Sequence, residues 1–168
     1  MAAVHDADKP EDAEDAGRLA DFAAELAGAV EAALPGWVER SVDRIVTAYR
    51  GQTDGETRAR AVAAGHEAAG IVGAEVRALL ATDVDEQRAN PLAVLRRAVR
   101  YPTSVLREAG VPPVVRDEFA ERAFPDDDYD LAPATWSDVD PALHEPGLVW
   151  GAAKAHVVLA RRRAEGKR

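Results

Sequence analysis

The sequence predicts an all-α fold, a compact multi-helix bundle in which a long proline- and aromatic-rich ordered strap, about residues 125–146, precedes a buried C-terminal helix. Apolar residues recur at three- and four-residue spacing along most of the chain, which is the pattern of amphipathic helices. Proline, glycine and asparagine fall between these segments and predict turns. No segment shows the alternation of apolar and polar residues that is typical of a strand.

Composition favours one small domain. The chain has 168 residues, of which 47% are apolar and 30% charged, as in folded globular proteins. Six acids and one lysine lie within residues 1–15, which lack apolar periodicity and predict a disordered acidic arm. We therefore expect a single helical domain over residues 16–165, followed by a basic end at 166–168.

Charge and residue usage limit the possible location, source and binding partners of the protein. Neither a signal peptide nor an apolar stretch long enough to span a bilayer is visible, and cysteine is absent, so we expect a soluble cytoplasmic protein without membrane contact. Eighteen arginines against three lysines indicate a GC-rich bacterial genome of the actinobacterial kind. Of the net charge of −9, residues 1–15 carry −5 and the rest of the chain only −4, so the body is mildly acidic and its charge is only a weak argument against nucleic-acid binding.

The first 82 residues predict a helical hairpin and one long helix. A helix over 16–34 is expected to end at Pro35-Gly36, and a second helix over 37–50 would fold back on it. The long helix, over about 53–82, is expected to begin with a capping box in which Thr53 and Glu56 bond each other's backbone amides.

Glycines form a nearly bare ridge on this long helix. Gly65, Ala69 and Gly73 recur every four residues, and Gly70 adds a third glycine. Because each glycine costs a helix nearly 1 kcal/mol relative to alanine, the ridge predicts that a neighbouring backbone lies close. The alternative is that GC-rich coding alone has scattered the glycines.

Prolines delimit the elements of the second half. Asn90-Pro91 predicts a helix start, with asparagine as N-cap and proline at the first helical position. Tyr101-Pro102 is expected to end this helix, and a short helix follows over 103–109. Another helix is expected to open at Pro112-Pro113 and to end at Phe124-Pro125. Its apolar residues are Val115 and Phe119.

The strap and the last helix carry the strongest structural prediction. Large apolar residues recur through 125–146, so we expect an ordered segment with single helical turns capped near 135–138 and at Asp140-Pro141. The helix over 147–164 is apolar almost all the way round, which predicts a position at or near the centre of the fold. Trp150 and Leu159 are expected to be buried.

Between Leu148 and Ala160, Lys154 and His156 are the only strongly polar side chains. In one interpretation, Lys154 is a buried base or a cation for an anionic ligand. In the favoured one, its stem follows the helix, its ammonium pairs with an acid from 126–130, and Trp150 lies beneath it as a cation–π partner. His156 is expected to be a core histidine bonded to a backbone carbonyl.

Two further strap residues would complete a site with Lys154 and His156. His144 and Glu145 have the side-chain types of a metal or acid–base site. Because no compact motif accompanies them, they are weak catalytic candidates, and we predict neither a metal nor a cofactor. The absence of catalytic fingerprints favours a protein that is not an enzyme.

Four arginines form a basic face. Arg96, Arg97 and Arg100 share one side of the helix that starts at Pro91, and Arg107 follows on the next helix. Like charges at this spacing oppose helix formation unless something neutralises them. We favour an internal belt of ion pairs with the acids of 126–130. The alternative is an external anion, such as nucleic acid or a phosphate-bearing ligand.

Three functions of different classes follow. The favoured one is a small regulatory protein that binds an unknown protein partner and self-associates through its alanine-rich helices. The second is a nucleic-acid or ribosome-associated binder that uses the basic face. The third is an enzyme or small-ligand-binding protein that uses Lys154, His156 and His144 with strap carboxylates.

Overall fold

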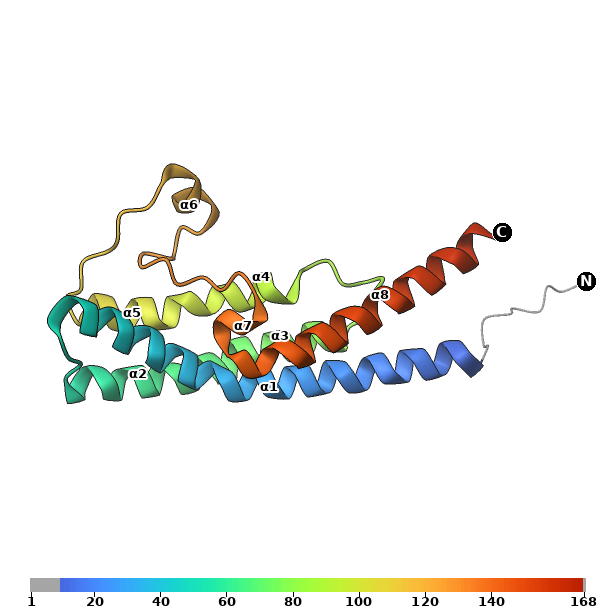
Figure 1. Ribbon diagram of the computed structural model, residues 1–168, viewed down its shortest axis with the longest axis horizontal. Coiled ribbons are helices and arrows are strands. Elements are labelled where there is room, and N and C mark those ends of the chain that lie inside the picture. The colour runs from blue at the N-terminus through green and yellow to red at the C-terminus, as the bar shows by residue number, and fades with distance from the viewer. Residues whose placement is uncertain (1–9, 168) are drawn as a thin grey trace, which may run out of the picture.

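The structure, a computed structural model that describes residues 10–167, is an all-α bundle and contains no strand within that range (Figure 1). This confirms the predicted fold class. The elements are α1 (Pro10–Arg50), α2 (Gly55–Ala68), the π-helical turn η1 (Ala69–Gly73), α3 (Ala74–Ala81), α4 (Pro91–Arg96), the 3-10 turn η2 (Arg97–Val99), α5 (Arg100–Glu108), α6 (Glu118–Ala123), α7 (Trp136–Val139), the 3-10 turn η3 (Pro141–Leu143) and α8 (His144–Gly166).

Helix α1 is one continuous helix, so the predicted hairpin of 16–34 and 37–50 is wrong. Its fully buried residues recur every four positions across Pro35-Gly36: Leu26, Val30, Leu34, Val38, Val42 and Val46. Burial on both sides of the proline stabilises the helix enough to offset a cost of about 3 kcal/mol for an interior proline. The axis changes direction near the middle of α1 (Figure 1).

The start of α1 also differs from prediction. The helix begins at Pro10, so residues 10–15 of the expected disordered arm are helical. Residues 1–9 lie outside the described part of the chain.

The predicted glycine ridge meets α1. A Cβ at Gly65 would lie 2.9 Å from both the Cα and the carbonyl oxygen of Pro35, and one at Gly73 would lie 2.7 Å from Cγ of Glu31. Gly70 faces open space instead. Two of the three glycines therefore permit close approach of the helices, as predicted, and the third does not.

Two local predictions for the helix over 53–82 need correction. Its N-cap is Asp54, whose carboxylate accepts a hydrogen bond of 2.8 Å from the Thr57 amide, and the expected cap Thr53 donates to Asp43 instead. The helix also contains the π-helical turn η1, so it is α-helical only on either side of 69–73.

The next helical segment starts as predicted but continues further. Asn90 caps α4, and Pro91 takes its first position. Tyr101-Pro102 does not end the segment, because η2 joins α4 directly to α5 and Pro102 lies in the first turn of α5. The helix expected from Pro112 begins only after Asp117, whose side chain accepts from the amide of Ala120 at 2.7 Å.

The strap is ordered, as predicted. Tyr129, Leu131, Val139 and Leu143 are buried. Both predicted single turns form, as α7 and η3. Asp127 is only 1% exposed, and its two carboxylate oxygens accept backbone amides of the strap at 2.7 and 2.9 Å.

Helix α8 is not the centre of the fold, contrary to prediction. It packs against α1, α7 and η3, whereas α1 also contacts α2, α3 and α5 and is the central element. Trp150 is buried, as expected, but Leu159 is 51% exposed. The last turns of α8 extend away from the other helices (Figure 1).

Candidate functional site

The side chains predicted to form a catalytic group do not converge. His156 is exposed and lies 3.2 Å from the carboxylate of Asp15, not in the core beside a backbone carbonyl as predicted. His144 is exposed twelve residues earlier on the same helix, which separates the two histidines by about 18 Å along the axis. Among residues 10–167, no three His, Cys, Asp or Glu side chains gather closely enough to hold a metal ion.

Lys154 has a neutral partner. Its ammonium donates a hydrogen bond of 2.6 Å to the side-chain carbonyl of Gln87, not to an acid of 126–130 as predicted. It also lies 5.1 Å from the ring centroid of Trp150, which confirms the cation–π contact. Partial burial lowers the pKa of Lys154, since the charged form loses solvation.

Gln87 was missed by the sequence argument. Its amide nitrogen donates to the backbone carbonyls of Leu79 and Thr82 at the end of α3, so this one side chain connects α3 to α8. Lys154 therefore contacts a neutral hydrogen-bond acceptor and an aromatic ring, and both contacts lie within the fold.

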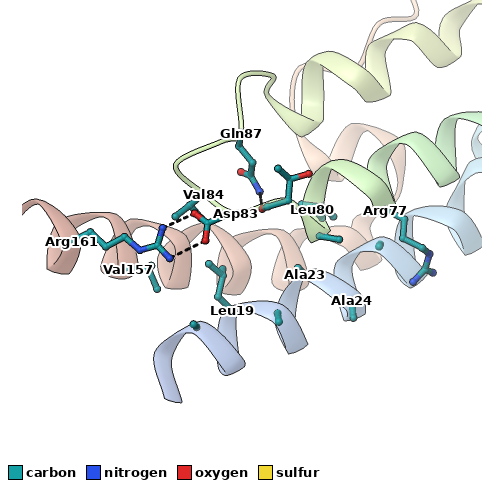
Figure 2. A pocket seen from close by; sticks show the side chains of 15 residues that line it. Leu19, Ala23, Ala24, Arg77, Leu80, Asp83, Val84, Gln87, Val157 and Arg161 are labelled. Atoms are coloured by element: carbon teal, nitrogen blue, oxygen red, sulfur yellow. Dashed lines mark hydrogen bonds and ion pairs between the residues drawn. The ribbon is translucent and has the colours of Figure 1, made fainter. Parts of the chain in front are cut away.

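A groove of about 380 Å³ lies between α1, the end of α3, the 82–87 loop and α8 (Figure 2). Alanines of α1 line one side, and Leu80, Val84 and Val157 contribute larger apolar groups. At one end, Arg161 pairs with Asp83 at 2.6 Å and also with Asp85. The charged residues that line the groove, Arg77, Asp83 and Arg161, are each in an ion pair (Figure 2).

The ion pair between Arg161 and Asp83 at this groove lowers the pKa of the aspartate. The guanidinium of Arg161 donates hydrogen bonds that lower the pKa of Asp83 to about 2. Asp83 therefore stays ionised through the range in which ordinary carboxyls become protonated.

The arginines of the basic face contact different partners. Arg107 donates to Asp128 at 2.7 Å, which is the one ion pair of the predicted belt that the described residues contain. Arg97 pairs instead with Glu75 on α3 at 3.2 Å. Arg96 donates to the carbonyl of Pro133 at 2.9 Å, which ties the strap to α4.

Arg100 has no acidic partner within residues 10–167. Its guanidinium lies over the ring of Tyr101 at 5.2 Å. It lines a cavity of about 480 Å³ between η2 and the end of α6, together with Arg96, Arg97, Phe124 and Asp126. Three of the four predicted arginines thus line one cavity, together with Asp126 and Asp127, whereas Arg107 lies outside it.

Residues 112–124, which we call the α6 lobe, carry an unexpected apolar surface. Phe119 is 78% exposed, Val115 is fully exposed and Val114 is 42% exposed. No residue of α6 is buried, and the lobe stands away from the helical bundle (Figure 1). The apolar residues predicted for this helix therefore do not face the core.

Hydrogen bonds nevertheless hold the lobe in a defined conformation. Arg116 donates to the carbonyl of Phe124 at 2.7 Å, at the end of α6. The amide of Val114 donates to the carbonyl of Asp128, and the hydroxyl of Tyr129 donates to the carbonyl of Val111. The lobe thus presents its apolar side chains from a fixed backbone.

Comparison of the chain with known protein families, with curated proteins and with solved structures found no match. No helix within residues 10–167 is long and apolar enough to cross a membrane.

Proposed function

We propose that this protein is a small regulatory protein of the cytoplasm that acts by binding a protein partner, and that the α6 lobe is the binding surface. The observation that carries the proposal is the exposure of Phe119 and Val115 on a segment that contributes nothing to the core. Exposed aromatic groups that gather with other apolar side chains are typical of interfaces.

The hydrogen bonds of the lobe support the same proposal. A surface that is already ordered loses little conformational entropy on binding, so more of the contact energy appears as affinity. Burial of one phenylalanine side chain contributes about 1.5–3 kcal/mol. The partner expected from this geometry has a concave apolar site that accepts Phe119.

Site-specific photo-crosslinking tests the proposal. A photoreactive phenylalanine analogue placed at position 119, in cells of the source organism, should form a discrete adduct with one protein. The matched control is the same analogue at Tyr49, which is 54% exposed on α1. No adduct from position 119, or the same adducts from both positions, would contradict the proposal.

Binding of a phosphate-bearing anion is a second candidate function, favoured by the arginine cavity. Arg100 has its charge uncompensated by an acid in the described chain, and Arg96 and Arg97 line the same space. Titration calorimetry with inorganic pyrophosphate should show binding that Arg100→Gln abolishes. Arg107→Gln is the control, because Arg107 lies outside the cavity. Equal binding by both variants would exclude this site.

A further inference from the structure

The outward face of α8 carries an apolar stripe that no other element within residues 10–167 covers. Leu148 is 59% exposed and Leu159 is 51% exposed, and Ala152 and Ala155 between them are exposed as well. The side of α8 that contacts the rest of the protein is the opposite one, where Gly147, Trp150 and Val157 are buried.

Charged residues continue the stripe at both ends. Glu145 precedes it and Arg162 follows it; both are exposed, and neither has an ion-pair partner among residues 10–167. The six stripe positions are 145, 148, 152, 155, 159 and 162. Their alternating spacing of three and four residues is the seam of a coiled coil, and the seam spans about 26 Å of helix.

The stripe is complementary to a second copy of itself that runs in the opposite direction. About a midpoint between residues 153 and 154, Glu145 corresponds to Arg162, Leu148 to Leu159, and Ala152 to Ala155. A twofold axis through this midpoint would therefore place an acid on a base, a leucine on a leucine and an alanine on an alanine. Isologous contacts of a symmetric dimer have this property.

We propose that α8 packs antiparallel against α8 of a second copy of this chain. The two alanines at the centre let the helix backbones approach closely, and the leucines cover the contact on either side. Glu145 of each copy meets Arg162 of the other at both ends. A parallel pair would instead place Glu145 beside Glu145 and Arg162 beside Arg162, which like-charge repulsion disfavours.

Sedimentation analysis provides the first test. The wild-type chain should show a monomer–dimer equilibrium between micromolar and millimolar concentrations, as expected for a small interface. Ala152→Glu should be monomeric throughout, with unchanged helix content. Ala48→Glu, an exposed alanine of α1, is the control and should dimerise like the wild type. A monomeric wild type, or a dimer unaffected by Ala152→Glu, would overturn the proposal.

Charge exchange tests the pairing of the seam ends. Glu145→Arg alone and Arg162→Glu alone should each dimerise at least tenfold more weakly than the wild type, because like charges then meet at both ends. An equimolar mixture of the two variants should recover dimerisation, since both ends of the mixed dimer are again complementary. A mixture as weak as the single variants would refute the pairing.

Cysteine cross-linking fixes the direction of the helices, because the chain has no cysteine of its own. A mixture of Leu148→Cys and Leu159→Cys chains should form a disulfide-linked heterodimer, as positions 148 and 159 face each other only in the antiparallel arrangement. Leu148→Cys alone should cross-link poorly. Efficient cross-linking of Leu148→Cys to itself would show a parallel pair and overturn the antiparallel register.

Discussion

Substitution of the helical glycines by alanine tests the packing of α1 against α2. In Gly65→Ala, the new Cβ would lie 2.9 Å from the Pro35 backbone, which is too close and cannot be relieved by a side-chain rotation. In Gly70→Ala, nothing lies within 4 Å of the new Cβ. Both substitutions gain nearly the same helix propensity, about 1 kcal/mol, so the difference between them isolates the cost of overpacking.

That difference has a definite expected size. Overpacking of a closely packed interior costs about 1–3 kcal/mol, so Gly65→Ala should be less stable than Gly70→Ala by this amount. Its melting temperature should be lower by about 2–12 °C, at about 2–4 °C per kcal/mol for a chain of this size. Gly70→Ala itself should be slightly more stable than the wild type.

Urea unfolding followed by far-ultraviolet circular dichroism measures both variants under the same conditions. Gly73→Ala provides a third point, because its new Cβ would lie 2.7 Å from Cγ of Glu31, a side-chain atom that can shift more readily than the Pro35 backbone although Arg77 holds the Glu31 carboxylate. The expected order of stability is Gly70→Ala, then Gly73→Ala, then Gly65→Ala. If Gly65→Ala proved as stable as Gly70→Ala, the close approach of α2 to Pro35 would be refuted.

Three further outcomes are expected from the contacts of the strap, the 82–87 loop and α8. Asp127→Asn should lower the free energy of unfolding by about 1.5–3 kcal/mol, because an amide cannot accept both strap amides; an unchanged urea midpoint would contradict this. The lowered pKa of Asp83, about 2 against an ordinary 3.8, stabilises the fold above pH 3.8, and this contribution is lost as the pH falls through about 2. Arg161→Gln removes the ion pair that lowers this pKa. The variant should be less stable than the wild type above pH 3.8, and the difference should shrink as the pH falls from 3.8 to about 2. A difference that stays constant over this range would argue against the ion pair. Trp150→Ala should cost about 3–5 kcal/mol, whereas Phe119→Ala should stay within about 0.5 kcal/mol of the wild type in thermal unfolding.

The sequence predicted best those features that depend on local backbone chemistry. Asn90-Pro91 starts a helix because the asparagine oxygen accepts an amide and proline needs no donor there, and both effects are independent of the rest of the fold. The turns at α7 and η3 follow from the same kind of capping. Burial of Trp150 was predictable because few other large groups were available to fill the core.

Tertiary packing overrode the local signals elsewhere. Pro35-Gly36 would end an isolated helix, but the buried stripe of α1 continues in phase from Leu34 to Val38 and stabilises one helix across it. The unbroken four-residue spacing was the available signal, and it outweighs the proline. In α8, five of the eleven apolar residues are alanines, and Leu148, Val149 and Leu159 are exposed, so an apolar composition did not indicate burial on all sides.

The contacts of the candidate site residues could not be predicted from the sequence, because their partners come from segments that have no recognisable sequence pattern. Gln87 lies in the loop between α3 and α4, and nothing in its neighbourhood marks it as the partner of Lys154. The arginines were identified correctly as a group, but the ion pair of Arg97 with Glu75 depends on how α3 crosses α4, which only the fold determines.

We expect the two proposed surfaces to bind different partners, because only the α8 stripe is self-complementary. The α8 stripe matches its own reverse, whereas the exposed Phe119 and Val115 of the α6 lobe show no such pairing. A dimer formed through α8 would therefore leave both lobes free and related by the twofold axis. Such a dimer would bind a multivalent partner more tightly than a monomer does, because the second contact becomes intramolecular. Ala152→Glu should then weaken capture of a multivalent partner without altering the affinity of a single lobe.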